Sequence, residues 1–156
     1  MTEFADIEGG RIAYDVTGQG PLVVLSHGIG DRRQSFRFLA LRLAQAGYRV
    51  AAADLRGHGE SSMGWTSVTG KDAISRTDIA GDLLALIRHL GGPAVIVGHS
   101  ISGGAATIAA AMEPELVSGI VEINPFTRVP KADLGALLRN RATARAALMP
   151  VTDIAA

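Results

Sequence analysis

The sequence of 156 residues contains no cysteine, which excludes disulfide bonds, thiolate metal ligands and a cysteine nucleophile. Neither sign of charge is in excess, because 15 basic side chains balance 15 acidic ones, and nucleic acid or an anionic membrane is therefore not an expected partner. No apolar run approaches the roughly 18 residues of a membrane span. The starting segment MTEFADIEGG also lacks the basic and apolar regions of a signal peptide. We therefore expect a cytoplasmic protein.

What the sequence does contain is an alternation of strand-like and helix-like segments. A polar–apolar alternation typical of a half-exposed strand occupies residues 11–18. Continuous apolar runs typical of parallel strands covered on both faces follow at 22–28, 48–57, 94–100 and 118–125. The pattern predicts an α/β fold in a single domain, residues 1–156, with a mainly parallel sheet and helices on both faces.

Helical spacing of apolar residues separates these strands. One helix is expected from an N-cap at Asp31 to a stop at Gly47, and a second begins at a cap on Thr77 or Asp78. An alanine-rich helix follows the serine at position 100, and a last helical pattern begins near Asp133. No histidine or carboxylate pair has a recognisable metal-ligand spacing, so no metal or cofactor is expected.

The stretch VIVGHSISGG, residues 95–104, places Ser100 at the junction of an expected strand and helix. A serine hydroxyl is a weak nucleophile that needs an oriented base and donors for the oxyanion. A sharp strand–turn–helix junction lifts such a side chain clear of the sheet and directs free N–H groups at the oxyanion. The alternative reading is an ordinary helix N-cap, a place where serine is common.

At this point the chain resembles the α/β-hydrolase fold family. GHSISGG resembles its nucleophile elbow, whose usual pattern is G-x-S-x-G, with Ser102 in place of the last glycine. LSHGIGD at 25–31 and DLRGHGESS at 54–62 resemble two further loops of that family, in the family's order. The resemblance implies Ser100 as nucleophile and the backbone N–H groups of Ile29 and Ile101 as the oxyanion hole.

The same resemblance implies that His27, Gly28 and His99 line the site. In the family the catalytic order is serine, then an acid, then a histidine. Here no histidine follows His99, and the acid position after the sixth strand holds Asn124; Glu122 lies within that strand, and Asp133 and Asp153 lie beyond it. The chain therefore resembles the N-terminal part of the family fold, as far as the sixth strand, with residues 128–156 as the start of a cap or lid.

Two functions remain open on these grounds. The first is a serine hydrolase acting on a small carboxylic ester or related acyl substrate, with a base from a partner chain, from a longer natural product or from one of the four histidines, His27, His58, His89 and His99. Serine in place of aspartate argues against epoxide hydrolase or haloalkane dehalogenase chemistry. The second is a catalytically inactive binding or dimerisation module.

The expected strand at 118–125, which corresponds to the sixth strand of the family fold, predicts a partner as well. An open sheet edge presents unpaired N–H and C=O groups that folded proteins normally cover. We expect either the C-terminal helix or a second chain, such as a copy in a two-fold homodimer, to cover this strand.

Overall fold

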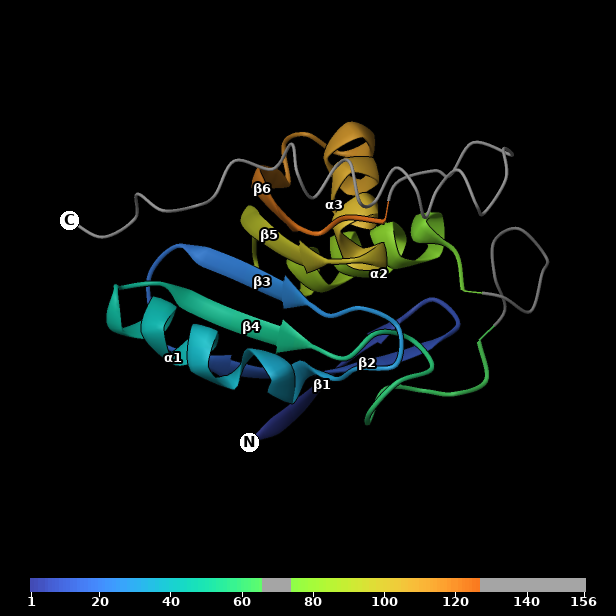
Figure 1. The fold of residues 1–156 in the computed structure, drawn as a ribbon, viewed down its shortest axis with the longest axis horizontal. Coiled ribbons are helices and arrows are strands. Elements are labelled where there is room, and N and C mark those ends of the chain that lie inside the picture. The colour runs from blue at the N-terminus through green and yellow to red at the C-terminus, as the bar shows by residue number, and fades with distance from the viewer. Residues whose placement is uncertain (66–73, 127–156) are drawn as a thin grey trace, which may run out of the picture.

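The computed structural model describes residues 1–65 and 74–126, and these form one sheet with helices packed on it (Figure 1). The six strands lie in the order β1-β2-β4-β3-β5-β6. The strands β4, β3, β5 and β6 are mutually parallel, whereas β2 runs antiparallel to both β1 and β4. The predicted α/β class, with a mainly parallel sheet, is confirmed.

Five expected strand segments are present with tighter limits than the apolar runs indicate, and a further strand precedes them. The bounds are β1 Thr2–Ile7, β2 Gly10–Thr17, β3 Leu22–Ser26, β4 Arg49–Ala53, β5 Ala94–His99 and β6 Val117–Ile123. The helices are a 3₁₀ turn, η1, at Arg33–Phe36, and α1 Arg37–Gln45, α2 Arg76–His89 and α3 Ile101–Met112. The motif residues after β3, β4 and β5 thus fall where parallel strands reach one common edge.

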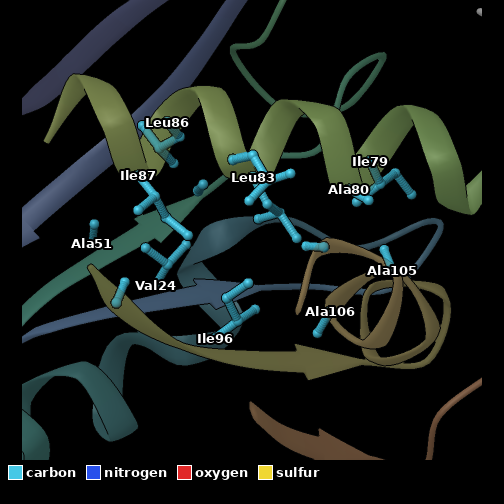
Figure 2. Close-up of a cluster of buried hydrophobic side chains, with 14 of the residues drawn as sticks. Val24, Ala51, Ile79, Ala80, Leu83, Leu86, Ile87, Ile96, Ala105 and Ala106 are labelled. Atoms are coloured by element: carbon cyan, nitrogen blue, oxygen red, sulfur yellow. The ribbon is translucent and has the colours of Figure 1, made fainter. Parts of the chain in front are cut away.

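Alternate residues of the central strands face two separate apolar clusters. On one face, Val24, Ala51 and Ile96 pack under α2 and α3, against residues such as Ile87 and Ala106 (Figure 2). On the other face, residues of β3, β4 and β5 pack with Phe36 and Ala40 of η1 and α1. The period of two residues along a strand produces this division, and the expected helices on both faces are confirmed.

Both predicted helix caps are wrong. The first α-helix begins at Arg37 because the preceding residues tighten into η1, where Arg33 turns inward and its backbone N–H donates to Asp54 Oδ1 at 2.8 Å. Asp31 instead accepts bonds from the Arg32 N–H and the Ser35 hydroxyl. The second helix is capped by Ser75, whose hydroxyl accepts from the Asp78 N–H at 3.1 Å.

The strand β6 forms one edge of the sheet among the described residues. It pairs only with β5 there, and Val121 and Ile123 are 49% and 40% exposed. The expected cap segment at 128–156, with the helix near Asp133, lies outside the described residues. Within the part of the chain that the structure describes, no helix is long and apolar enough to cross a membrane.

Candidate active site

Ser100 occupies a strained backbone position between β5 and α3. Its φ of 56° and ψ of −116° lie in the left-handed half of the Ramachandran plot, which a residue with a β-carbon rarely enters. Flanking chain holds it there: the Ser100 N–H donates to the Ile123 carbonyl at 3.0 Å, and the Phe126 N–H donates to the Ser100 carbonyl at 2.7 Å. The end of β6 therefore fixes the elbow.

Glycines allow the surrounding backbone to approach this turn. A β-carbon on Gly98 would lie 2.4 Å from the Ser102 carbonyl oxygen, so only glycine lets β5 pass the first turn of α3. A β-carbon on Gly28 would lie 3.1 Å from both Ser100 Cβ and His99 Nδ1. The loop after β3 is thus in close contact with the elbow.

The backbone N–H groups of Ile29 and Ile101 remain available. Among the hydrogen bonds of the described residues, neither group donates to a protein acceptor. Ile101 is the first residue of α3, where N–H groups have no partner within the helix and the helix dipole favours negative charge. These features fit an oxyanion site.

Ser102 is fully buried in the first turn of α3. Its hydroxyl donates to the His27 carbonyl oxygen at 2.6 Å and accepts from the Ser26 hydroxyl at 2.9 Å. The pattern G-x-S-x-G places a glycine at this position, and no sequence pattern assigns a role to the Ser102 hydroxyl.

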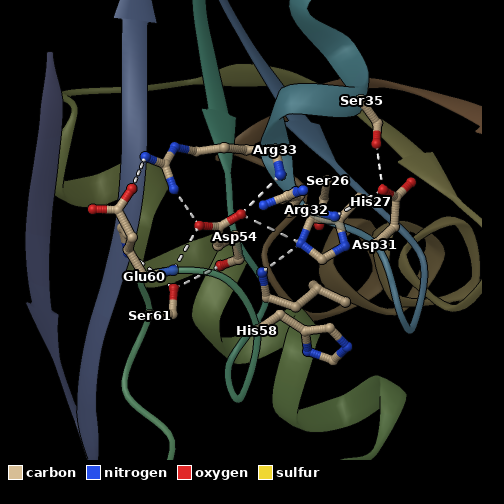
Figure 3. Close-up of polar contacts among 12 residues, drawn as sticks. Ser26, His27, Asp31, Arg32, Arg33, Ser35, Asp54, His58, Glu60 and Ser61 are labelled. Atoms are coloured by element: carbon tan, nitrogen blue, oxygen red, sulfur yellow. Dashed lines mark hydrogen bonds and ion pairs between the residues drawn. The ribbon is translucent and has the colours of Figure 1, made fainter.

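Two of the four histidines, both drawn in Figure 3, are engaged in loop hydrogen bonds. His27 is fully buried, and its Nε2 accepts from the Leu55 N–H at 3.1 Å while its Nδ1 lies 2.7 Å from the Gly28 carbonyl. His58 Nε2 accepts from the Gly30 N–H at 3.1 Å. Because a nitrogen that accepts an N–H carries no proton itself, the His27 ring is neutral in this arrangement. Burial lowers the pKa of His27 in the same sense.

The other two histidines do not contact the Ser100 hydroxyl either. His89 ends α2, and its Nε2 lies 3.1 Å from the Tyr14 hydroxyl. His99 ends β5 beside Gly28, and no hydrogen bond joins a described histidine to the Ser100 side chain. The structure therefore brings Gly28, which precedes Ile29, against Ser100 and His99, and the described residues supply no oriented base for Ser100.

A buried ionic cluster holds the loops after β3 and β4 together (Figure 3). Asp54 accepts from the backbone and guanidinium of Arg33 and from the Glu60 N–H at 3.0 Å. The Arg33 guanidinium also donates to Asp15 Oδ2 and Thr2 Oγ1, at 2.8 and 2.7 Å, and to the Glu60 carboxylate. Sequence inspection missed this cluster, although an aspartate directly after an apolar run was the available signal.

A second buried ion pair supports the other side of the loop after β4. The Arg56 guanidinium donates to both Asp82 oxygens, at 2.7 and 2.6 Å, and lies 4.4 Å from the centre of the Trp65 ring. Burial raises the pKa of Asp82. Within residues 1–65 and 74–126, no group of three or more histidine and carboxylate side chains is arranged to hold a metal ion.

Comparison with known proteins identifies the family to which this fold belongs. The sequence model of the alpha/beta hydrolase fold matches residues 21–152, and the chain belongs to that family. A 2-(acetamidomethylene)succinate hydrolase of Mesorhizobium japonicum is 38% identical over 121 residues, which cover 76% of this chain and 41% of that protein. Epoxide hydrolase B of Mycobacterium tuberculosis is 37% identical over 110 residues, covering 69% of this chain and 30% of that protein.

Solved structures similar to this chain include epoxide hydrolases as well. An epoxide hydrolase from an endophytic Streptomyces has a TM-score of 0.68 and 32% identity, over 78% of this chain and 36% of that one. An epoxide hydrolase from Vigna radiata has a TM-score of 0.73 and 28% identity, over 90% of this chain and 46% of that one. The chain thus spans less than half the length of these relatives.

Proposed function

We propose that this chain carries the nucleophile and the oxyanion hole of a serine hydrolase that cleaves a small carboxylic ester or a related acyl compound. The observation that carries the proposal is the strained, left-handed Ser100 next to two free backbone N–H groups. Strain of this kind costs about 1–3 kcal/mol and persists where the surroundings enforce it, often at active sites. An ordinary N-cap requires no such conformation, because its backbone is extended.

In the proposed reaction, Ser100 Oγ forms a bond to the substrate carbonyl carbon and loses its proton to a base. The carbonyl oxygen becomes an oxyanion that accepts from the Ile29 and Ile101 N–H groups. Collapse breaks the bond to the leaving alkoxide or amine, which takes up a proton, and water then hydrolyses the acyl-serine. Because no hydrogen bond joins a described histidine to the Ser100 side chain, the base and its acid would come from another polypeptide segment.

The relatives named as epoxide hydrolases raise the alternative of epoxide opening. Attack of a serine oxygen on an epoxide carbon forms an ether, which has no carbonyl for water to attack, whereas attack by a carboxylate forms an ester that water can cleave. Ser100 therefore favours acyl chemistry. The Mesorhizobium relative, whose substrate name contains an acetamido group, is consistent with an acyl substrate.

A non-catalytic binding or dimerisation module is the second candidate. It is favoured by the structural use of His27, His58 and His89 and by the absence of a hydrogen bond from any described histidine to Ser100. In that case the small residues of the elbow serve packing alone.

Hydrolysis of p-nitrophenyl acetate distinguishes the two candidates. The chain is compared with Ser100→Ala and with Ser118→Ala, a control at an exposed serine of β6. Each protein is assayed with and without added imidazole, which can replace a missing base. We expect Ser100→Ala to lower the rate by at least about 10²-fold, the scale of losing one essential catalytic element, and the control to leave it unchanged. Equal rates for all three proteins at every imidazole concentration would support the non-catalytic module.

A further inference from the structure

One buried side chain forms a hydrogen bond between the loop after β3 and the elbow helix. Ser102 lies in the first turn of α3, two residues after the nucleophile, and its side chain is inaccessible to solvent. Through its hydroxyl it contacts the carbonyl of His27 at 2.6 Å. The next peptide along the chain, between Gly28 and Ile29, carries the Ile29 N–H. This N–H is the proposed oxyanion donor of the loop.

The other hydrogen bonds of this loop lead away from α3. Gly30 donates to His58 Nε2 at 3.1 Å, and Asp31 donates to the Gly28 carbonyl at 3.2 Å within the loop itself. His27 is bonded on both ring nitrogens to the Gly28 carbonyl and the Leu55 N–H. Among the hydrogen bonds of the described residues, those of Ser102 are the ones that join the loop after β3 to the elbow helix.

A two-donor oxyanion hole requires a fixed separation between its donors, because the energy of each bond depends on distance and angle. Here the two donors come from different loops, Ile29 after β3 and Ile101 at the start of α3. Glycine at position 102 would provide no hydroxyl, so the hydrogen bond between α3 and the loop after β3 would be lost.

We propose that Ser102 is a positioning residue that fixes the Ile29 N–H relative to the Ile101 N–H through its bond to the His27 carbonyl. The oxyanion role of Ile29 rests on the proposed function. The restraint of the Ile29 N–H by Ser102 does not depend on it. Ser26 takes a different part: its hydroxyl donates to Ser102 Oγ at 2.9 Å and orients the Ser102 proton toward His27. Its loss leaves the bond between Ser102 and the loop in place.

The test compares Ser102→Ala with Ser26→Ala, because each removes one buried hydroxyl from the same cluster. Backbone ¹⁵N relaxation gives the order parameter of the Ile29 amide in each protein. We expect a value near about 0.85 in the native chain and in Ser26→Ala, and a fall below about 0.6 in Ser102→Ala. A purely structural role would lower stability in both variants without selecting Ile29.

Unchanged order at Ile29 in Ser102→Ala overturns the proposal, as does a native chain in which Ile29 already shows the low value. If Ser102→Ala fails to fold, Ser102→Gly takes its place, because the family pattern accommodates glycine there. The measurement needs no turnover. A chain that lacks Ser100-dependent ester hydrolysis but loses Ile29 order in the variant therefore contradicts the proposed function and not the positioning role.

Discussion

At the scale of single residues, the backbone of Ser100 makes a prediction that is independent of catalysis. Its φ of 56° imposes a steric cost on any residue with a β-carbon, and glycine avoids that cost. We expect Ser100→Gly to be more stable than Ser100→Ala by about 1 kcal/mol, measured as the free energy of unfolding in urea.

The control is the same pair of substitutions at Ser118 in β6, which has no positive φ. There the larger entropy loss of glycine in a strand makes the glycine variant the less stable one, by roughly 0.5–1 kcal/mol. The same order of stability at both positions would show that Ser100 is not strained.

A second prediction at this scale concerns His27 and pH. Burial lowers its pKa below the ordinary value of 6.5, so the unfolded chain binds a proton that the folded chain does not. Stability is then complete above pH 6.5 and is lost as the pH falls toward the folded-state pKa, by up to about 1.4 kcal/mol per pH unit from this group.

Unfolding in urea at a series of pH values measures this slope. Replacement of the ring by an amide in His27→Gln should flatten it, because the amide does not titrate in this range. An unaltered slope in His27→Gln would contradict the assignment of the neutral ring.

The resemblance of short motifs to one family predicted where the candidate site residues lie along the fold. Ser100, Ile29 and Ile101 belong to short motifs, and their placement at strand ends follows from the chain direction. The Ser102–His27 bond and the pairing of Arg33 with Asp54 join positions that are 75 and 21 residues apart. A periodic pattern in the sequence does not indicate which distant side chains come into contact. These two contacts therefore could not be predicted from the sequence.

At the scale of secondary-structure elements, the start of α2 can be tested directly. Ser75 and Asp78 form a reciprocal capping box, in which the Ser75 N–H donates to the Asp78 carboxylate at 3.0 Å. We expect Ser75→Ala to destabilise the chain by about 1 kcal/mol, read from urea unfolding. Thr77→Ala is the matched control, since Thr77 is exposed one residue inside the helix, and its effect should be small. Equal losses would contradict the assigned cap.

The misplaced caps have a common physical cause. Serine, threonine and aspartate all satisfy the composition of a cap, and only the backbone geometry selects among neighbouring candidates. At α1 the selection is tertiary, because the inward turn of Arg33 converts the expected first turn into η1. Helix existence was predictable from spacing, whereas helix beginnings depended on such contacts.

At the scale of the whole molecule, β6 is an open edge of the described sheet. Its N–H groups that face away from β5 have no strand partner among the described residues, and its apolar side chains are partly exposed. We propose that a second copy of this chain pairs with β6, or that residues after 126 cover it, and in either case these amides should be protected.

Hydrogen exchange along β6 tests whether the edge is covered, and sedimentation velocity distinguishes the two arrangements. A protected edge in a dimer supports pairing between copies, and a protected edge in a monomer supports coverage by the same chain. Rapid exchange of these amides in a monomer would contradict both.

The ion pairs of Arg33 affect which substitutions this cluster tolerates. Its guanidinium contacts Asp54, Asp15 and Glu60 together, so three carboxylates, one from β2 and two from the loop after β4, share one cation. Loss of Arg33 leaves the buried Asp54 charge unpaired, whereas loss of Glu60 alone leaves two partners in place. We therefore expect loss of Glu60 to be tolerated more readily than loss of Arg33.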